Sequence, residues 1–513
     1  MASASLFGRD KICAVVAATT VPDDWQQLCR ALKFTRSVEL RLDWLKNGGE
    51  VAKLLAELKL RRPRAAFIAT FRRRATGGHF AASVSAQLAR LDSASRAGCL
   101  WHDLEVESLP GISRGQTEQF LRKGKWILSW HKFRHPQTGS SLKAQLRKLD
   151  LNSRKGRFAA IKIAAQCNSL AEGLRALRIA RGKRNVITVP MGEVATPARI
   201  LALREGSALA YAPVEAATAP GQISLEEMKH LYRADKLDRH TRVYGVIGNP
   251  VAHSLSPHLH NAGFHARRVN AVYLPFQVKD LRDFLAAIKP LGIRGFSISL
   301  PHKESILRHL DDCDPLAAAI GAVNTVVVRD GGRLYGYNTD YVGVLRALER
   351  RIPLRGSRVL IFGAGGAARA VAFALESGGA SIAVCARRPA RAQKLARAVH
   401  AEVVPRSALR REFFDAIVNA TPVGMHPRAN QSPLAAGELN CRLVFDLIYR
   451  PRETKLLKLA ARRGIETISG IEMFLAQGIA QWEIWMGERA PEKQMRAAVI
   501  EALSPEESLR ENR

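Results

Sequence analysis

Residues 158–165 read Phe158-Ala159-Ala160-Ile161-Lys162-Ile163-Ala164-Ala165, an apolar run that contains a single charged residue, Lys162. A short run of this kind is typical of a strand buried on both faces of a parallel sheet. Burial of a lysine without a partner disfavours its charged form, and the neutral amine is a nucleophile that can form an imine with a carbonyl substrate. The alternative from the run alone is a strand end whose lysine simply reaches water.

On both sides of this run, residues 12 to 222 alternate short apolar stretches with helix-like stretches. The pattern predicts eight strands, at 12–17, 37–42, 66–70, 101–106, 126–130, 159–163, 185–190 and 208–212. Eight strands at this spacing predict a (β/α)8 TIM barrel, in which the chemistry lies at the C-terminal ends of the strands. Polar residues crowd at those ends, namely Glu39, Arg41, Arg72, Asp103, Glu105, His131, Lys162 and Arg199. Their clustering predicts an active site in the first half of the chain.

A polar, charged stretch from Ser224 to about Arg239 follows the barrel pattern. Ser224 and Glu227 fit a capping box, which predicts that this stretch is a helix beginning at Ser224. A new strand then begins at Arg242, and strands and helices alternate again. We therefore interpret the stretch as the element that separates two halves of the chain.

The second half contains a dinucleotide-binding turn. The apolar strand 357–362 runs into Gly363-Ala364-Gly365-Gly366-Ala367-Ala368, and a helix-like stretch follows. This is the G-x-G-x-x-A variant in the strand-turn-helix context that the motif requires. The glycines let the backbone approach a pyrophosphate, and the start of the helix supplies oriented N–H groups. The alternative is a glycine-rich turn that binds nothing.

The next strand, at 380–385, ends in Ala386-Arg387-Arg388. An NAD site would place Asp or Glu near here for the ribose hydroxyls. The guanidinium groups of Arg387 and Arg388 instead suit a 2′-phosphate by charge and by geometry. The sequence therefore favours NADP as the cofactor, unless these two arginines merely belong to a basic surface.

Further polar residues precede this turn. Ser254 and Ser256 lie just before a predicted helix and can hydrogen-bond a carboxylate. Lys303 follows the buried strand at 297–300, and Asp340 follows Asn338 and Thr339. A lysine and an aspartate beside one substrate hydroxyl would form a proton-transfer pair for alcohol–ketone interconversion. Asp340 could equally be a helix N-cap and Lys303 a surface residue.

Composition bounds the other classes of function. The net charge of +33 would attract nucleic acid or small anions, but aromatic residues make up only 6%, which argues against a platform for stacking bases. The seven cysteines include no Cys-x-x-Cys pair, so we expect free thiols in a reducing cytoplasm and neither zinc nor disulfides. No apolar run is long enough to span a membrane, and residues 1–11 are too short and too mixed for us to expect a signal peptide there.

The second half, from about residue 242 to 505, resembles shikimate dehydrogenases. The matching stretches are Gly245–Pro250, Ser254–Pro257, Pro301–Lys303, Gly321–Thr325, Asn338–Asp340, Gly363–Ala368, Asn419–Met425, Asp446–Tyr449 and Gly470–Gln481. The resemblance implies that Ser254 and Ser256 hold a substrate carboxylate and that Lys303 and Asp340 are the catalytic pair. It further implies substrate contacts by Ser299, Asn324, Tyr449 and Gln477, and cofactor contacts by Asn419, Thr421, Met425 and Gly470. Ser297 and Ser299 stand where many members carry Asn and Thr.

The first half, from about residue 10 to 225, resembles type I 3-dehydroquinate dehydratases. The matching stretches are Glu39–Asp43, Thr70–Arg72 with Gly77-Gly78, Asp103–Glu105, Ser129–Phe133, Ile161–Ala164, Met191-Gly192 and Ala219–Gln222. The resemblance implies that Lys162 forms the imine and that His131 is the general base. It implies substrate contacts by Glu39, Arg41, Arg72, Arg199, Thr218 and Gln222. Thr218 replaces the usual serine and keeps its hydroxyl, whereas Thr76 replaces an acidic residue.

Together the two resemblances imply a bifunctional enzyme of the shikimate pathway in the cytoplasm. Its substrates would be 3-dehydroquinate, 3-dehydroshikimate and shikimate, its cofactor NADP, and neither step would need a metal, a membrane or a specific nucleic acid. The expected domains are a barrel at 1–225, a linker helix at 226–241, a substrate-binding domain at 242–343 joined by 470–505, a Rossmann domain at 344–469 and a tail at 506–513. The alternatives are a quinate dehydrogenase in the second half, a basic nucleic-acid-binding protein, and a scaffold with one dead site, which the change at Thr76 suggests.

Overall fold

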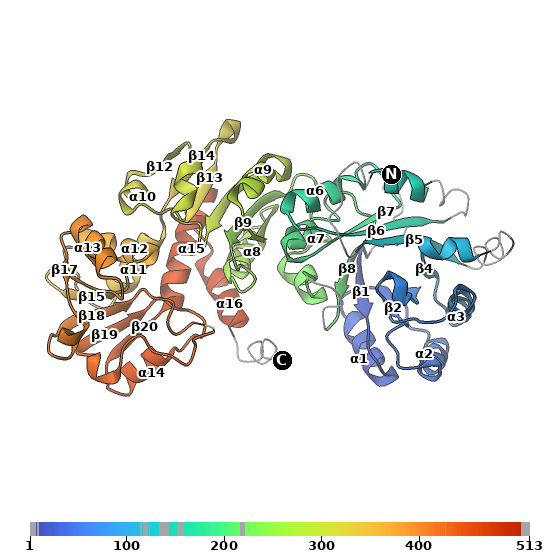
Figure 1. Ribbon diagram of the computed structural model, residues 1–513, viewed down its shortest axis with the longest axis horizontal. Coiled ribbons are helices and arrows are strands. Elements are labelled where there is room, and N and C mark those ends of the chain that lie inside the picture. Colours follow the sequence, from blue (N-terminus) through green and yellow to red (C-terminus); the bar gives the residue numbers. More distant parts are fainter. Residues whose placement is uncertain are drawn as a thin grey trace. The chain divides into compact units, whose positions relative to one another are not determined.

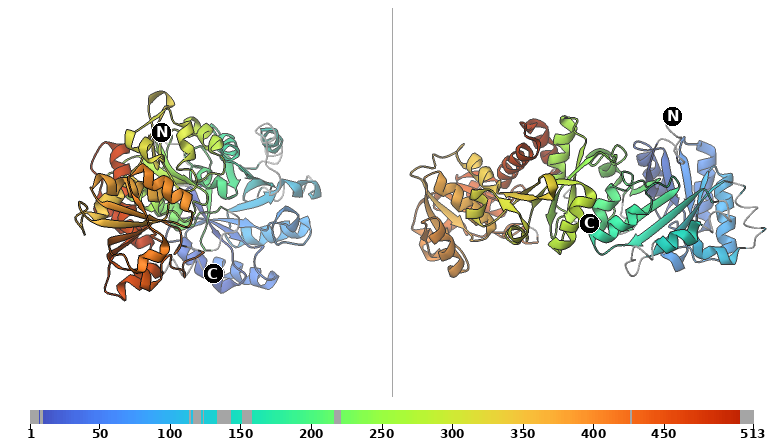
Figure 2. Two further views of the ribbon diagram at one scale, coloured as in Figure 1. Left: turned by 60° about the vertical axis from the view of Figure 1, so that its left-hand side comes forward. Right: turned by 90° about the horizontal axis from the view of Figure 1, so that it is seen from above.

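The computed structural model describes residues 7, 10–112, 115, 122, 124–132, 143–150, 158–215, 221–425 and 427–503. Contacts divide the chain into two compact units (Figures 1 and 2). One unit comprises residues 1–241 with 270–291, and the other comprises 242–269 with 292–513. Within the described part of the chain, no helix is both long and apolar enough to cross a membrane.

The first unit is built on a parallel sheet of eight strands in the order β7-β6-β5-β4-β3-β2-β1-β8. The sheet nearly closes on itself, because the N–H of Ala208, just before β8, donates to the carbonyl of Val186 in β7 at 2.9 Å. The barrel predicted from the spacing of apolar runs is therefore confirmed. The strands are β1 (Ile12–Val16), β2 (Ser37–Arg41), β3 (Ala66–Thr70), β4 (Trp101–Glu105), β5 (Lys125–Lys132), β6 (Ala160–Gln166), β7 (Val186–Met191) and β8 (Ala210–Pro213).

Side-chain caps begin several helices of this unit. Thr20, Asn47, Ser83 and Ser169 each accept a hydrogen bond from a backbone N–H in the first turn of the helix that follows. Such caps satisfy donors that would otherwise lack partners at the helix start, and they are worth about 1 kcal/mol each. The elements are α1 (Val21–Ala31), α2 (Gly48–Arg61), α3 (Val84–Arg96), α6 (Leu170–Arg178), α7 (Thr196–Ile200), β10 (Ala271–Gln277) and α9 (Leu281–Leu291).

The helix predicted from Ser224 to Arg239 is much shorter in the structure. The capping box itself is present, since the Ser224 hydroxyl accepts from the N–H of Glu227 at 3.2 Å and a Glu227 carboxylate oxygen accepts from the N–H of Ser224 at 3.0 Å. Helical bonding nevertheless covers only residues 225–231, of which η4 (Glu227–Leu231) is a π-helical turn. Arg233 then adopts a left-handed backbone with φ 46°, which ends the helix. Met228 and Tyr232 are buried, so the segment packs into the first unit rather than forming a polar connector.

The second unit begins with a mixed sheet in which β9, β11, β13, β14 and β12 are neighbours in that order. Strands β9 and β11 run parallel, whereas β13 is antiparallel to both β11 and β14. The strands are β9 (Arg242–Gly248), β11 (Ile293–Ile298), β12 (Asp312–Cys313), β13 (Thr325–Val328) and β14 (Leu334–Tyr337). The helices that accompany them are α8 (Ser256–Ala266), α10 (Pro315–Ile320), α11 (Asp340–Leu348), α15 (Gly470–Met486) and α16 (Glu492–Ala502).

A second, wholly parallel sheet follows in the order β17-β16-β15-β18-β19-β20. This is the doubly wound order 3-2-1-4-5-6 of dinucleotide-binding folds, so the predicted Rossmann domain is confirmed. Its strands are β15 (Arg358–Phe362), β16 (Ser381–Cys385), β17 (Glu402–Val403), β18 (Phe414–Asn419), β19 (Cys441–Asp446) and β20 (Glu466–Ser469). Its helices are α12 (Gly366–Ser377), α13 (Pro389–Ala398) and α14 (Lys455–Ala461).

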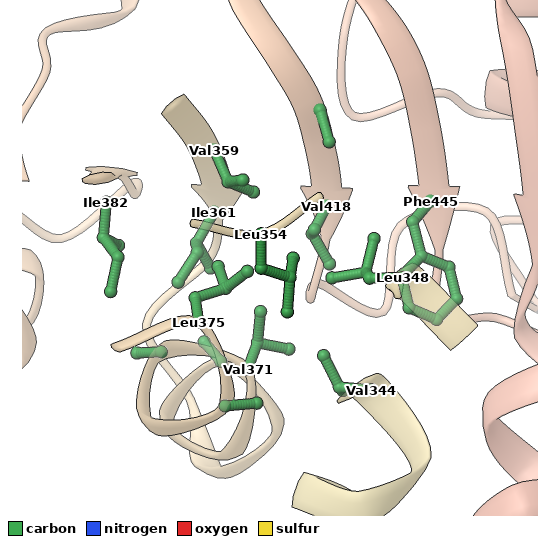
Figure 3. Close-up of a cluster of buried hydrophobic side chains, with 14 of the residues drawn as sticks. Val344, Leu348, Leu354, Val359, Ile361, Val371, Leu375, Ile382, Val418 and Phe445 are labelled. Atoms are coloured by element: carbon green, nitrogen blue, oxygen red, sulfur yellow. The ribbon is translucent and has the colours of Figure 1, made fainter. Parts of the chain in front are cut away.

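Apolar side chains bury both faces of this sheet. Val359 and Ile361 of β15 face α11, α12 and α13, while Leu360 between them belongs to the cluster on the face covered by α14 (Figures 1 and 3). The alternation follows from the period of two residues in a strand. Val371 and Leu375 of α12 are fully buried against the first face. This packing fixes α12 at the C-terminal end of β15, where the dinucleotide turn lies.

Candidate active sites

Lys162 lies inside β6 with its ammonium between two carboxylates from other strands of the barrel. Its Nζ is 3.0 Å from Oδ2 of Asp103 in β4 and 3.2 Å from Oε1 of Glu39 in β2. The side chain is only 5% exposed, so the expectation of burial is met. The expectation of a lysine without a partner is wrong, because both neighbours stabilise its charged form. Nucleophilic attack by this amine therefore requires that its proton first pass to a neighbouring base.

The two carboxylates are themselves held in place by hydroxyl groups of the barrel wall. The hydroxyl of Ser129 donates to Oδ1 of Asp103 at 2.5 Å, and the hydroxyl of Thr70 donates to Oε1 of Glu39 at 2.9 Å. Burial opposes the charged form of Asp103, but the nearby positive charges, first that of Lys162, lower its pKa below the usual range. Asp103 is thus ionised at neutral pH and anchors the lysine.

His131, at the end of β5, is buried on the same side of the barrel. Its pKa lies well below the ordinary value of 6.5 because burial, and then the charges of Arg72, Lys162 and Arg41, disfavour the imidazolium. The side chain is therefore a neutral imidazole at physiological pH. A neutral imidazole can accept a proton, which suits the role of a general base.

Seven of the residues predicted in the first half line one cavity of about 130 Å³. Arg41 is held by a two-point ion pair with Asp43, with both N–O distances 2.9 Å. Arg199 donates from Nε to the carbonyl of Pro190 at 2.5 Å, and burial lowers its pKa to about 10. The members that the sequence predicted are Glu39, Arg41, Arg72, His131, Lys162, Arg199 and Gln222, and those that it missed include Trp44, His79, Met191 and Tyr211. Thr218 lies outside the described residues.

Several buried donors of this cavity have no acceptor within the described part of the chain. They are Nε1 of Trp44, Nε of Arg72, Nη2 of Arg199 and the hydroxyl of Tyr211. A buried donor without an acceptor is costly unless a ligand satisfies it. The cavity is therefore built for a ligand rich in oxygen acceptors, and the two guanidinium groups favour one that carries a negative charge.

Thr76, the departure noted in the sequence, has a definite place beside this cavity. Its hydroxyl lies 3.0 Å from Oε1 of Glu105, which also accepts from the N–H of Arg73 at 2.9 Å. The other oxygen of Glu105 accepts from Nε2 of Gln87 at 2.6 Å. Thr76 thus helps to hold the Glu105 carboxylate.

The second unit brings Lys303 and Asp340 together. Nζ of Lys303 is 2.5 Å from Oδ2 of Asp340, the first residue of α11. The carboxamide of Asn324 donates to Oδ1 of Asp340 at 2.8 Å, so both carboxylate oxygens are engaged. Oε1 of Gln477 in α15 lies 3.5 Å from the same carboxamide nitrogen. Four residues predicted from widely separated motifs therefore form one connected group.

The remaining predicted substrate contacts stand on neighbouring elements. Ser254 and Ser256 follow β9, and the N–H of Ser256 lies 3.3 Å from the Ser254 hydroxyl. Ser299 follows β11, the strand that pairs with β9, and its N–H donates to the carbonyl of Ile247 at 2.8 Å. The ring of Tyr449 packs on Phe474 of α15 at 4.8 Å between centroids. Among the described residues, no hydrogen bond joins Ser254, Ser256 or Tyr449 to the group around Lys303.

The dinucleotide turn fits a pyrophosphate. Gly365 is the N-cap of α12, no side chain caps the first turn, and a Cβ on Gly365 would meet only open space. Gly363 has φ 127°, and a Cβ there would lie 3.0 Å from the carbonyl oxygen of Ala420. The uncapped N–H groups of the helix start are thus available to an anion. Gly366, Ala364 and Ala367 belong to the same turn and the start of its helix.

Two further groups flank this turn. Arg387 and Arg388 follow β16, both are exposed, and neither makes an ion pair with a described residue. Thr421 and Met425 lie in the loop after β18. Asn419, the last residue of β18, is fully buried, and its carboxamide donates to Oδ1 of Asp446 at 2.9 Å. The Asn419 side chain therefore holds the start of this loop, because its oxygen accepts a hydrogen bond from the N–H of Thr421 at 3.0 Å.

Two contacts in the second unit were not predicted from the sequence. Gly470, which we expected to contact the cofactor, is the first residue of α15. Its backbone lies so close to Leu447 that a Cβ on residue 470 would clash with the Leu447 carbonyl oxygen. Arg369 in α12 forms an ion pair with Glu304, the residue after Lys303. The glycine-rich motif gave no sign of this pair, because both partners look like ordinary surface residues.

Three family models match the chain. Residues 12–239 match the type I 3-dehydroquinase model, 246–326 match the shikimate dehydrogenase substrate binding domain, and 470–500 match the shikimate 5′-dehydrogenase C-terminal domain. The chain is 31% identical over 505 residues to the chloroplastic bifunctional 3-dehydroquinate dehydratase/shikimate dehydrogenase of Arabidopsis thaliana, spanning 94% of this chain and 83% of that protein.

Other relatives match the second half alone. The chain is 45% identical over 278 residues to the shikimate dehydrogenase (NADP(+)) of Moorella thermoacetica, which covers 51% of this chain and 94% of that protein. A crystal structure of a shikimate dehydrogenase in complex with NADP+ is 38% identical and aligns with a TM-score of 0.50, over 52% of this chain and 98% of the other.

The fold and the sites define a two-part α/β enzyme, with a lysine-centred cavity in a barrel and a Lys-Asp pair beside a dinucleotide-binding domain. The chain belongs to the family of bifunctional 3-dehydroquinate dehydratases/shikimate dehydrogenases.

Proposed function

We propose that this chain dehydrates 3-dehydroquinate to 3-dehydroshikimate and then reduces 3-dehydroshikimate to shikimate with NADPH. The similarity over nearly its whole length to a bifunctional enzyme with these activities supports both steps. The observation in the structure that carries the proposal is the buried Lys162 in a cavity where donors of Trp44, Arg72 and Arg199 have no acceptor in the described part of the chain. The Lys303–Asp340 pair in the unit that holds the dinucleotide turn supports the second step.

In the first reaction, the Lys162 amine attacks the ketone carbon of the substrate after its proton has passed to a neighbouring base. The carbonyl oxygen leaves as water, and a protonated imine joins the substrate to Nζ. His131 then removes the proton from the carbon next to the imine, which accepts the electron pair. The proton returns with the departing hydroxyl group, so that water is lost, and a second water releases the product from Lys162.

The residues around Lys162 suit this sequence of steps. Glu39 and Asp103 lie within 3.2 Å of Nζ, and we assign the proton that the ammonium must lose to Glu39, because nearby positive charges hold the pKa of Asp103 low. His131 is kept neutral by burial and by nearby positive charges, so it can accept the second proton. Arg41, Arg72, Arg199 and Gln222 line the cavity and are proposed to bind the carboxylate and the hydroxyl groups of the substrate.

In the second reaction, NADPH when bound supplies the hydride that reduces the ketone. Lys303 donates a proton to the substrate oxygen as it gains negative charge, and Asp340 holds the Lys303 ammonium in place. Asn324 fixes the other oxygen of Asp340. We assign Ser254, Ser256 and Ser299 to the substrate carboxylate and Tyr449 and Gln477 to further contacts with the substrate.

The residues that would hold NADP belong to the Rossmann domain. Gly363 to Ala367 present the uncapped start of α12 to the pyrophosphate, and Arg387 with Arg388 are proposed to bind the 2′-phosphate. The loop of Thr421 and Met425 would line the nicotinamide side, with Asn419 and Gly470 holding that region in shape.

We further propose the domain limits 1–225, 226–241, 242–343 with 470–505, 344–469 and 506–513, and a cytoplasmic location. All seven cysteines are free thiols, the state that a reducing compartment maintains. The name of the Arabidopsis relative places that protein in the chloroplast.

A coupled assay tests the two activities together. Starting from 3-dehydroquinate and NADPH, the purified chain should consume cofactor, because only two working sites in sequence produce a substrate for reduction. Supplying 3-dehydroshikimate directly tests the second site alone. Comparing the rates of NADP+-dependent oxidation of shikimate and of quinate shows which of the two the second site prefers. No consumption of NADPH from either starting compound would refute the proposal.

A further inference from the structure

Tyr211, on β8, is a polar residue of the barrel cavity that neither the sequence motifs nor the matched family residues assigned. Its ring lies 4.1 Å from Nζ of Lys162, and it lines the same cavity as His131 and Arg199. Its hydroxyl oxygen is buried and has no hydrogen-bond partner among the described residues. The side chain therefore stands against the nitrogen at which the first reaction begins.

The environment fixes the role that this hydroxyl can take. Burial, and then the charges of Glu39, Cys13 and Asp103, raise the pKa of Tyr211 well above 10. The group therefore remains protonated throughout the physiological range, and it can donate a hydrogen bond but cannot act as a base at neutral pH. A buried donor without an acceptor lowers stability unless it serves a bound ligand.

The aromatic ring of Tyr211 can also stabilise a positive charge on Nζ of Lys162. An aromatic face within about 6 Å of a cation attracts it electrostatically. This attraction acts on the ammonium of the free enzyme and equally on the protonated imine that forms at Nζ. The Tyr211 ring can thus stabilise the intermediate while its hydroxyl donates a hydrogen bond to an oxygen of the substrate.

We propose that Tyr211 is a further substrate-contacting residue of the dehydratase site, whose hydroxyl donates a hydrogen bond to a substrate oxygen beside the carbon that Lys162 attacks. This inference rests on the proposed function of the first unit. In this proposal the hydroxyl hydrogen-bonds the substrate, and the ring stabilises the positive charge on Nζ. A substitution that removes only the hydroxyl therefore distinguishes the two contributions.

The variant Tyr211→Phe removes the hydroxyl and keeps the ring. We expect kcat/KM for 3-dehydroquinate to fall about ten- to a hundredfold, the usual effect of losing a buried hydrogen bond to a bound substrate. The unfolding temperature of the free protein should stay the same or rise, because the hydroxyl has no hydrogen-bond partner among the residues that the structure describes. Reduction of 3-dehydroshikimate by the same preparation should not change, which reports the integrity of the rest of the chain.

Tyr232→Phe is the matched control, because Tyr232 is a buried tyrosine of the same unit that does not line the cavity. It should keep kcat/KM within twofold of the parent. A Tyr211→Phe variant that also keeps the parent kcat/KM would overturn the inference. So would a variant that is less stable or does not fold, because the hydroxyl would then have a partner in the free protein. A parent that does not turn over 3-dehydroquinate would instead refute the proposed function.

Discussion

Lys162 must be positively charged to bind Glu39 and Asp103, and neutral to attack a ketone. The two carboxylates resolve this conflict if one of them takes the proton, which makes the ion pairs part of the chemistry and not only of the fold. The sequence could predict the burial of Lys162 from the apolar run around it. It could not predict the pairing, because Glu39 and Asp103 are 123 and 59 residues away along the chain.

Lys162→Arg tests the nucleophile while preserving the charge between the two carboxylates. Arginine cannot form the imine, so we expect dehydration to fall by about a thousandfold or more, with reduction of 3-dehydroshikimate unchanged. Lys162→Ala should lose the same activity and also about 3 kcal/mol of stability, since it leaves two buried carboxylates without their cation. Borohydride reduction in the presence of substrate should trap an adduct at residue 162 of the parent. A mass-mapped adduct elsewhere in the chain would contradict this assignment.

Arg387 is the residue that we expect to distinguish the two nicotinamide cofactors. A charge-assisted hydrogen bond contributes about 1.5–3 kcal/mol, so Arg387→Ala should raise the KM for NADPH about ten- to a hundredfold. NADH lacks the 2′-phosphate, and its KM should hardly change. Arg391→Ala, an exposed arginine on the following helix α13, is the control and should affect neither cofactor. Equal losses for NADPH and NADH in Arg387→Ala would remove the argument for phosphate recognition.

At the scale of the element, the strands followed from local sequence far better than the connection at 224–239 did. Each barrel strand is a short run of buried residues bounded by polar ones, and such runs carry their own signal. The capping box at Ser224 also formed as its local motif predicts. The length of that helix depends instead on burial of Met228 and Tyr232 in the first unit and on the left-handed backbone of Arg233, which a polar-looking sequence does not reveal.

The turn between β15 and α12 gives a test at this scale. Gly363 has φ 127°, and a Cβ there would lie 3.0 Å from the Ala420 carbonyl oxygen. Gly363→Ala should strain the turn and raise the KM for NADPH about tenfold or more, because strained backbone of this kind costs on the order of 1–3 kcal/mol. Dehydration in the barrel should not change. Gly437→Ala in the same domain, where a Cβ meets nothing within 4 Å, should leave both activities intact. Normal reduction by Gly363→Ala would show that the turn does not carry the cofactor.

At the scale of the whole molecule, both units bury histidines as neutral groups. Burial lowers the pKa of His102 in the barrel to about 4 and that of His260 in the second unit to about 3. In the unfolded chain a histidine has a pKa of about 6.5. Between these values the unfolded state binds a proton that the folded state does not, so the free energy of unfolding decreases as the pH falls. We therefore expect low pH to decrease the free energy of unfolding of each unit through its own buried histidine.

His260→Gln isolates this contribution in the second unit. Relative to the variant, the parent should lose about 1.4 kcal/mol of unfolding free energy for each pH unit from about 6.5 down to about 3, because one proton is taken up on unfolding. The comparison between parent and variant cancels all other titrating groups. Urea unfolding at pH 7, 5.5 and 4.5 measures the difference. Gly437→Ala, which changes no titratable group and adds a Cβ that meets nothing within 4 Å, is the control, and its difference from the parent should not vary with pH. A parent and His260→Gln with parallel pH profiles would mean that His260 is already charged or solvated in the folded state.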